Sequence, residues 1–351
     1  MKAGKSLRRL GVPVLAAVFS SACSTLPTDH PLYNPLDWWD SLKRYAGFKQ
    51  IEPNTITDEK ACRTELSVLS YNIRALPLFT GRGEEAFEHI GHVFAKRAET
   101  REAPDIVLLQ EAFHSPFVDK IRAEFKFPYE ADGKHKEDKF ILDNGSGIEI
   151  WSQHPTGRVV KDTFSRSDPF ESLARKSVVV TTLDMPGLPE PLYIGTTHMN
   201  AGSEMSILDD IREQQIDESR ALYDRMDMRG KPFIFAGDFN FKPKHDSYYH
   251  MMEQFPELID AGAFCLVDEH CKEIIEDPDE TSLTPIWHTT NDRHFFSASE
   301  NQTIRIRPVE VIRNFDSDSH GYDELSDHHG YEVRYELSWD CDSQHAPAPA
   351  A

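Results

Sequence analysis

Several short apolar segments of this chain end in polar residues, and this pattern constrains the fold more than any other feature. The segment 233–236 runs into a glycine and then presents Asp238 and Asn240, while the segment 106–109 runs into Glu111. Polar side chains at the ends of neighbouring strands gather at the rim of a sheet, where ligands commonly bind. The residues at such ends are Asn72, Glu111, His198, Asn200, Asp238 and Asn240.

The spacing of these residues has a geometric meaning. In an extended chain, residues i and i+2 point to the same side, so Asp238 and Asn240 would face one point while Phe239 packs on the other side. His198 and Asn200 have the same spacing. The alternative at Asp238 is an Asx-turn, in which the carboxylate accepts a hydrogen bond from the turn that follows the strand.

The residue types at these strand ends suit metal binding and proton transfer. Carboxylate and amide oxygens are hard ligands for Mg²⁺ or Ca²⁺, and histidines move protons near neutral pH. Asp327 and His328 precede a further alternating segment at 331–337. Each residue alone also fits a structural role, since Glu111 could cap a turn or helix and His198 could be a buried structural histidine. Their ordered recurrence favours one common site.

The hydrophobic patterns predict a mixed α/β protein. Helical spacing covers 84–101 and most of 206–228. No internal repeat or linker interrupts residues 64–340, so we expect one domain, with bounds at 61–341. The predicted strands lie at 66–73, 105–109, 147–151, 177–183, 192–196, 233–236 and 331–337.

The N-terminal residues have the pattern of an export signal. A basic start, an apolar run at 10–19 and small residues before Cys23 predict a secretory signal peptide over 1–22. The apolar run is too short to span a membrane. Small residues followed by a cysteine resemble a bacterial lipobox, so we expect export to the periplasm, with Cys23 lipidated as in an outer-membrane lipoprotein. Cleavage after Ala22, which would release a secreted protein, is the alternative.

The segments that flank the domain differ from it in composition. Residues 24–60 contain prolines and few periodic apolar positions, which predicts a tether that packs partly through Trp38 and Trp39. Residues 342–351 form a low-complexity tail that we expect to be disordered.

Four cysteines remain after Cys23, and an even number in an exported chain suggests disulfides. Three pairings are open. Cys265 with Cys271 would close a local loop, and Cys62 with Cys341 would then tie the two ends of the domain together. The alternative is free or metal-bound thiols, which no C-x-x-C pair supports.

The formal net charge is −21 and the isoelectric point is about 5.1. Such a field repels polyanions at long range and argues against tight binding of nucleic acid. It does not exclude a nuclease that touches a few phosphates through a metal.

Seven segments, in order, resemble motifs of the endonuclease/exonuclease/phosphatase superfamily, which includes pancreatic-type deoxyribonucleases, inositol polyphosphate 5-phosphatases and neutral sphingomyelinases. The resemblance covers about 64–338. It implies a four-layer α/β/β/α sandwich, in which two mostly antiparallel sheets are flanked by helices and the site lies at one rim. The segments are LSYNIRALP, DIVLLQEAF, GSGIEIWSQHP, GTTHMNAG, FAGDFNFKP, DRHFFS and LSDHHGYEV.

Within the superfamily, the middle of the chain most resembles sphingomyelinases. Lys176 stands where this branch shows Lys-Gly, Asn200 where glutamine is common, and His294 in a slot of the DRHFFS segment that is unusually polar here. Lys176 and Asn200 are candidate substrate-binding residues, and a solvated Lys176 is the alternative. Sphingomyelinase toxins carry an aromatic hairpin before the last motif, but the matching segment 303–324 is charged, which disfavours insertion into membranes of the toxin type.

These residues suggest metal-assisted hydrolysis of a phosphodiester or phosphomonoester. Glu111, helped by Asn72, would hold one Mg²⁺, or another divalent cation such as Mn²⁺ or Ca²⁺. Asp327 would support the side of the site that binds the metal, or the loop that carries Asp327. The substrate is expected to be a phosphate ester, such as a membrane lipid head group or a small phosphodiester.

The remaining residues would position groups and transfer protons. His328 would take a proton from the attacking water, and Asp292 would orient its imidazole. Asp238 and Asn240 would place the water and the phosphate. His198 would stabilise the charged transition state or protonate the leaving group.

Two other functions compete with this interpretation. A secreted nuclease of the same superfamily is disfavoured by the net charge and by the sphingomyelinase-like middle. A surface-anchored binding protein on an inactive scaffold would lack catalytic groups, whereas every motif histidine, aspartate and asparagine is present here. We expect a monomer.

Overall fold

The computed structural model describes residues 37–49, 61–75, 83–132, 145–168, 175–202, 206–276, 284–316, 321 and 325–341. The predicted signal peptide, Cys23 and the predicted tail lie outside the described residues, as does part of the predicted tether.

The first sheet has seven strands, and four of its six strand pairs are antiparallel. Its members are β1 (Ala61–Asn72), β2 (Ile106–Gln110), β3 (Tyr129–Asp132), β4 (Glu149–Ser152), β10 (Lys272–Ile275), β12 (Arg305–Asn314) and β13 (Gly330–Asp340). Their order across the sheet is β10-β12-β13-β1-β2-β4-β3. The long central strands β1 and β13 pair from Ala61 opposite Asp340 to Ser70 opposite Tyr331.

The second sheet has six strands, and only its β7–β8 pair is parallel among the described strands. Its members are β5 (Val160–Thr163), β6 (Ser177–Leu183), β7 (Leu192–His198), β8 (Phe233–Asp238), β9 (Ile259–Asp260) and β11 (Asp292–Ser297). Their order is β5-β6-β7-β8-β11-β9. The two sheets therefore agree with the expected mostly antiparallel pairing.

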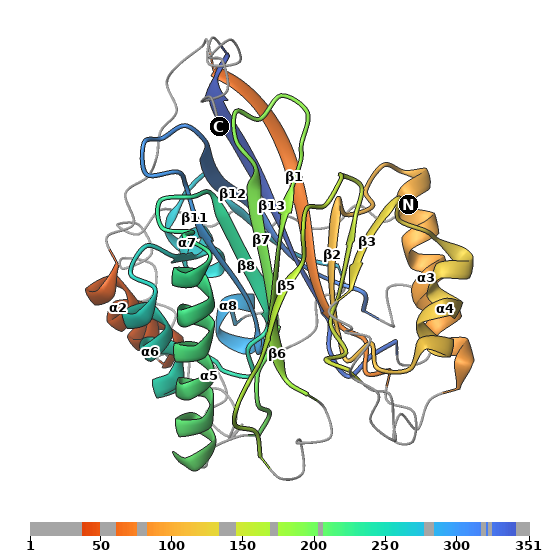
Figure 1. Cartoon of the computed structure of the whole chain (residues 1–351), viewed down its shortest axis with the longest axis horizontal. Coiled ribbons are helices and arrows are strands. Elements are labelled where there is room, and N and C mark those ends of the chain that lie inside the picture. The colour runs from red at the N-terminus through yellow and green to blue at the C-terminus, as the bar shows by residue number, and fades with distance from the viewer. Residues whose placement is uncertain are drawn as a thin grey trace, which may run out of the picture.

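Helices cover both outer faces of the paired sheets (Figure 1). Helices α3 and α4 lie on the first sheet, and α5, α6 and α2 lie on the second. The described helices are α2 (Asp37–Phe48), α3 (Glu84–Glu99), α4 (Ser115–Glu124), α5 (Ser206–Arg225), α6 (Asp246–Gln254), α7 (Ala261–Val267) and α8 (Ile286–Thr289). None of these helices combines the length and the apolar character that a membrane crossing needs. The predicted four-layer sandwich is confirmed.

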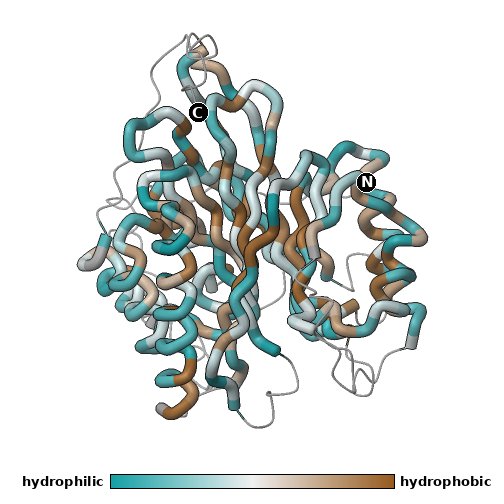
Figure 2. The backbone as a smooth tube through the Cα atoms, viewed as in Figure 1, coloured by the Kyte–Doolittle hydropathy of each residue, from teal (hydrophilic) through white to brown (hydrophobic). Residues whose placement is uncertain are grey.

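Strand β8 shows why the sequence packs in layers. Ile234 and Ala236 point into the core between the two sheets, and Phe233 and Phe235 point into the core beneath the helices. Because successive side chains of a strand alternate between faces, a strand that is buried on both faces is apolar throughout. The apolar strands accordingly run through the centre of the molecule in Figure 2.

The predicted tether contains a packed helix. In α2, Tyr45 is fully buried and Leu42 nearly so, and Trp38 and Trp39 pack half-buried against the same core. The Tyr45 hydroxyl also accepts a hydrogen bond of 3.0 Å from the backbone N–H of Asp260. Packing through the two tryptophans is thus present, but the helix that carries them was not predicted.

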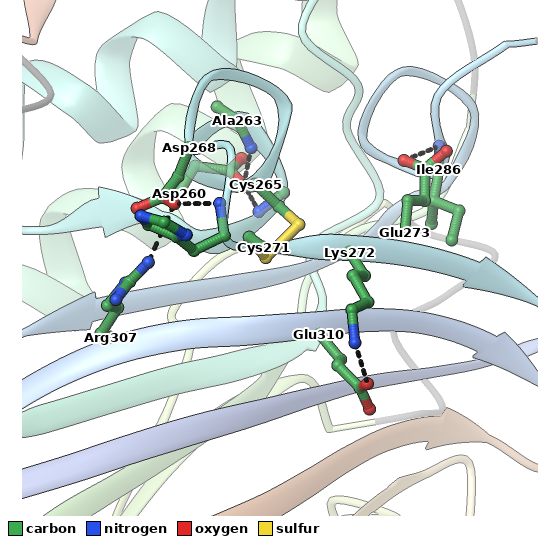
Figure 3. The surroundings of a disulfide bond; sticks show 12 residues. Asp260, Ala263, Cys265, Asp268, Cys271, Lys272, Glu273, Ile286, Arg307 and Glu310 are labelled. Atoms are coloured by element: carbon green, nitrogen blue, oxygen red, sulfur yellow. Dashed lines mark hydrogen bonds and ion pairs between the residues drawn. A yellow bond between two sulfur atoms is a disulfide. The ribbon is translucent and has the colours of Figure 1, made fainter. Parts of the chain in front are cut away.

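Both predicted disulfides are present. Cys62–Cys341 joins the start of β1 to the residue after β13. Cys265–Cys271 joins α7 to the segment before β10, and Figure 3 shows its surroundings. There the carboxylate of Glu273 accepts a hydrogen bond of 3.1 Å from the backbone N–H of Ile286, at the start of α8.

Candidate active site

The strands of the second sheet place three polar residues side by side. His198 ends β7, Asp238 ends β8 and Asp292 begins β11. The register pairs His198 with Asp238 and Asp238 with Asp292. Because β11 runs antiparallel to β8, its first residue lies where β8 ends. One rim of the sheet therefore collects an imidazole and two carboxylates.

The first sheet adds Asn72 and Glu111 to the same rim. Asn72 ends β1, and Glu111 directly follows β2, which is parallel to β1. The Asn72 side-chain amide donates hydrogen bonds of 3.1 Å to Glu111 Oε1 and of 3.1 Å to Asp238 Oδ2. The buried side-chain amide of Asn72 thus links the strand ends of the two sheets at this rim.

Two site residues have backbone angles that residues other than glycine seldom adopt. Glu111 has a φ of 55° and Asn240 a φ of 54°. Such left-handed conformations are uncommon outside glycine and cluster at functional sites. At Asn240 the cause is the turn after β8, in which Asp238 Oδ1 accepts a hydrogen bond of 3.0 Å from the Asn240 N–H.

This Asx-turn is the alternative that the sequence had left open. The chain is not extended after Asp238, so the i, i+2 geometry does not apply to Asn240. Its side-chain amide donates to the carbonyl of Met199 at 3.0 Å, and Phe239 is fully buried in the core beneath the helices.

His328 and Asp292 form a pair. His328 Nδ1 donates to Asp292 Oδ2 at 3.0 Å, which leaves Nε2 facing Asp238 Oδ2 at 3.8 Å. Burial disfavours the protonated imidazole, but the carboxylates of Asp238 and Asp292 outweigh burial and raise the pKa of His328 to about 10. The pair can hold a proton and aim one imidazole nitrogen at the site.

His198 has the opposite electrostatic environment. Its Nε2 lies 2.6 Å from Lys176 Nζ, 3.5 Å from Asp238 Oδ2 and 3.8 Å from Glu111 Oε1. Burial, followed by the charges of Lys176 and His328, lowers the pKa of His198 well below its usual range. A neutral His198 therefore accepts from the Lys176 ammonium through Nε2, and its hydrogen lies on Nδ1, a buried atom with no hydrogen-bond partner among the described residues.

Glu111 offers an oxygen that fits a cation. Its Oε2 is buried and has no hydrogen-bond partner among the described residues. Burial is the largest cause of a raised pKa at Glu111, since it destabilises the ionised carboxylate. A divalent cation at Oε2 would remove that cost, so the donor set fits a hard metal ion. Oxygen and nitrogen atoms of Asp238, Asp292 and His328 also lie within 4.8 Å of one another.

Asp327 lies at the edge of the site, and Asn200 lies outside it. Asp327 Oδ2 pairs with Arg74 Nη1 at 3.0 Å, at the partly exposed edge of the site. Asn200 is buried and turned to the neighbouring loop, where Oδ1 accepts from the Asp168 N–H at 2.7 Å and Nδ2 donates to the carbonyl of Ala201. No contact that the structure describes joins Asn200 to the other site residues, because the chain leaves the strand after His198.

Sequence reasoning assigned no role to two residues beside the site, Arg74 and Ser326. Arg74 contacts Asp327, and Ser326 donates to the carbonyl of Asn72 at 2.6 Å. Both lie inside segments that the sequence analysis singled out, but only their tertiary neighbours show what they touch. A cavity of about 350 Å³ opens beside His328, and its lining includes Thr290, Asp292, Arg313, Asp327, His328 and Tyr331.

The fold and this rim of acids, amides and imidazoles agree with a known family. A model of the Endonuclease/Exonuclease/phosphatase family matches residues 69–328. The chain belongs to this family, as the motifs predicted, and family members are phosphoesterases.

Solved structures share the fold at low sequence identity. A variant of beta toxin from Staphylococcus aureus with bound magnesium ions superposes with a TM-score of 0.57 at 15% identity, over 77% of this chain and 99% of that chain. Sphingomyelinase C from Streptomyces griseocarneus gives 0.55 at 19% identity, over 78% and 99%. TDP2 from D. rerio in complex with a single-strand DNA product gives 0.53 at 17% identity, over 78% and 99%. No curated protein sequence matches the chain.

Proposed function

We propose that the protein is a metal-dependent phosphodiesterase of the sphingomyelinase type, acting on lipid head groups or small phosphodiesters. One observation carries the proposal. The buried carboxylate of Asp238 accepts from Asn72, which also donates to Glu111. The same oxygen of Asp238 lies 3.8 Å from His328 Nε2, while Glu111 Oε2 has no hydrogen-bond partner among the described residues. A cation ligand and a proton acceptor therefore face one locus.

His328 is the proton acceptor in this mechanism. Asp292 holds Nδ1–H, so that Nε2 is the nitrogen available to an attacking water. The nearby Asp238 faces that same nitrogen and favours the imidazolium that forms when the water gives up its proton.

Glu111 would hold the cation through Oε2, while Asn72 fixes the other carboxylate oxygen of Glu111 and Asp327 lies nearby. A bound divalent ion would supply Lewis-acid stabilisation of the phosphoryl and leaving oxygens, and its charge would offset the carboxylates that keep His328 protonated.

Lys176 and His198 would act on the negative charge that develops on the phosphate. The Lys176 ammonium is a buried donor that His198 holds in place through Nε2, and such preorganised donors stabilise a transition state more than mobile water does. Asn240 is held by the Asx-turn and would help to place the phosphate.

The test is hydrolysis of bis-p-nitrophenyl phosphate, sphingomyelin and phosphatidylcholine with Mg²⁺. We expect activity that EDTA abolishes and that added Mg²⁺ restores. His328→Ala should lower kcat by about 10²–10⁴, while His92→Ala on the exposed face of α3 should leave kcat unchanged. Activity that survives thorough chelation, or a normal rate in His328→Ala, would contradict the mechanism.

A nuclease is the second candidate, because the fold also occurs in a protein solved with a DNA product. A plasmid-nicking assay under the same conditions separates the two. Nicking at rates that exceed hydrolysis of both lipids would favour the nuclease, against the expectation from the net charge of −21.

A further inference from the structure

Asp292 is held by more groups than His328 alone. Its carboxylate is almost fully buried. Oδ2, the oxygen that binds His328, also accepts from the Thr290 hydroxyl at 3.4 Å, and Oδ1 accepts from the Ser70 hydroxyl at 3.5 Å. The Asp292 N–H in turn donates to Thr290 Oγ1 at 3.0 Å. Thr290 therefore contacts both the backbone and the carboxylate of Asp292.

The backbone of Thr290 is itself fixed by a buried cation. Arg293 is fully buried in β11 and donates to three backbone carbonyls: Nη2 to Thr290 at 2.5 Å, Nε to Phe241 at 3.2 Å, and Nη1 to Trp287 in α8. Its Nη1 also lies 3.9 Å from the buried carboxylate of Asp260. The guanidinium thus joins the loop after α8 to the loop after β8.

We propose that Thr290, fixed by Arg293, is a positioning residue for the His328–Asp292 pair. The inference rests on the proposed function for its kinetic consequence, but not for its geometry. His328 lies in the loop that precedes β13 rather than in a strand, so the orientation of its ring depends on the hydrogen bond from Nδ1 to Asp292. If the Thr290 hydroxyl is removed, the carboxylate of Asp292 loses one hydrogen-bond donor. The backbone N–H of Asp292 loses its acceptor at the same time. The imidazole then loses a fixed partner.

The chain offers a matched control one residue away. The hydroxyl of Thr289 contacts the carbonyls of Ile286 at 3.2 Å, in α8, and of Pro285 at 3.5 Å, just before α8, and no described contact joins it to Asp292. Thr290→Val removes the hydroxyl in question, Thr290→Ser keeps it, and Thr289→Val removes a neighbouring hydroxyl from the same helix end.

Proton NMR measures the positioning without any need for turnover. The Nδ1–H resonance of His328, identified by its absence in His328→Gln, reports the hydrogen bond to Asp292. We expect the resonance to shift upfield or broaden beyond detection in Thr290→Val. It should stay at its wild-type position in Thr290→Ser and Thr289→Val. An unchanged resonance in Thr290→Val would overturn the proposal.

Steady-state kinetics on bis-p-nitrophenyl phosphate with saturating Mg²⁺ gives the second readout. A misplaced general base lowers kcat, and we expect a loss of about 10-fold to 100-fold in Thr290→Val with little change in KM. Thr290→Ser and Thr289→Val should keep the wild-type kcat. A Thr290→Val enzyme with normal kcat would overturn the kinetic part. If the wild-type chain hydrolyses no phosphate ester, the proposed function fails, while the NMR comparison still decides the positioning.

Arg293→Lys tests the support behind Thr290. Lysine keeps a positive charge near Asp260 but cannot donate to three carbonyls in one plane. We expect the same loss of kcat and the same change in the His328 resonance as in Thr290→Val, and no further loss when the two changes are combined. A lower Tm with normal kcat and an unchanged resonance would show that Arg293 serves stability alone.

Discussion

At the scale of single residues, two histidines near the same strand illustrate how environment decides chemistry. His328 lies between carboxylates, and its pKa rises to about 10. His294, in β11, is fully buried and has no charged partner in the part of the chain that the structure describes, and burial lowers its pKa to about 3. Its Nε2 donates to the carbonyl of Tyr331 at 3.0 Å, and Nδ1 accepts from the Tyr335 hydroxyl. His294 is therefore a neutral hydrogen-bonding link between the two sheets.

This burial predicts a loss of stability in acid. The folded pKa of His294, about 3, lies below the unfolded value, so the unfolded state binds the proton first. The stability is fully present above about pH 6.5 and is lost at roughly 1.4 kcal/mol per pH unit as the pH falls towards the folded pKa. His294→Gln keeps polar atoms without titrating. We expect its free energy of unfolding, measured in urea, to fall less between neutral and acidic pH.

The exposed His270 supplies the control for this experiment. His270→Gln should keep the wild-type pH dependence. If His294→Gln and the wild type lose stability with the same slope, the protonation of His294 does not contribute to acid unfolding.

At the scale of elements, the domain is closed by a pairing between its first and last described strands. Strands β1 and β13 run side by side along the centre of the first sheet, and Cys62–Cys341 joins them at one end. The bridge spans 279 residues of sequence, whereas Cys265–Cys271 spans 6. In the chain-entropy model, the longer loop restricts the unfolded chain more.

Removal of each bridge should therefore have a different cost. Replacing Cys62 and Cys341 by serine should lower the free energy of unfolding by about 3–5 kcal/mol, and replacing Cys265 and Cys271 by about 2 kcal/mol. Equilibrium unfolding in guanidinium chloride measures both. The reverse order of the two losses would mean that native-state packing around the bridges, rather than the entropy of the unfolded chain, sets their contribution.

At the scale of the whole molecule, the net charge of −21 acts on every anion that approaches the site. A zwitterionic head group meets less repulsion than a free phosphodiester anion. Added salt screens this long-range repulsion, so it should raise kcat/KM for an anionic substrate more than for a zwitterionic one.

The expected result is a salt response that depends on substrate charge. At saturating Mg²⁺, raising the salt from about 20 mM to about 200 mM should increase kcat/KM for bis-p-nitrophenyl phosphate, and it should change kcat/KM for zwitterionic glycerophosphocholine little. Equal responses to salt would show that the overall field does not select substrates.

Much of the fold follows from the sequence alone. Strong hydrophobic periodicity located most of the central strands, but not β11 or β12, and it located the two long helices α3 and α5, because burial repeats every two or nearly four residues along such elements. Short elements such as β5, β9 and α8 carry too few residues for a pattern. Helix α2 was missed because its buried residues, Leu42 and Tyr45, gain their partners only from distant segments.

The sequence by itself determined the family motifs, their order and the kinds of atom that end each strand. Only the tertiary structure decided which of these atoms meet. It placed His328 in contact with Asp292 and Asn200 in contact with Asp168. It also placed Thr290 in contact with Asp292, and Arg293 in contact with Thr290. The physical reason is that local patterns describe a strand only up to its last residue. Beyond that point, the direction of a side chain depends on turns and on register between segments that lie far apart along the chain.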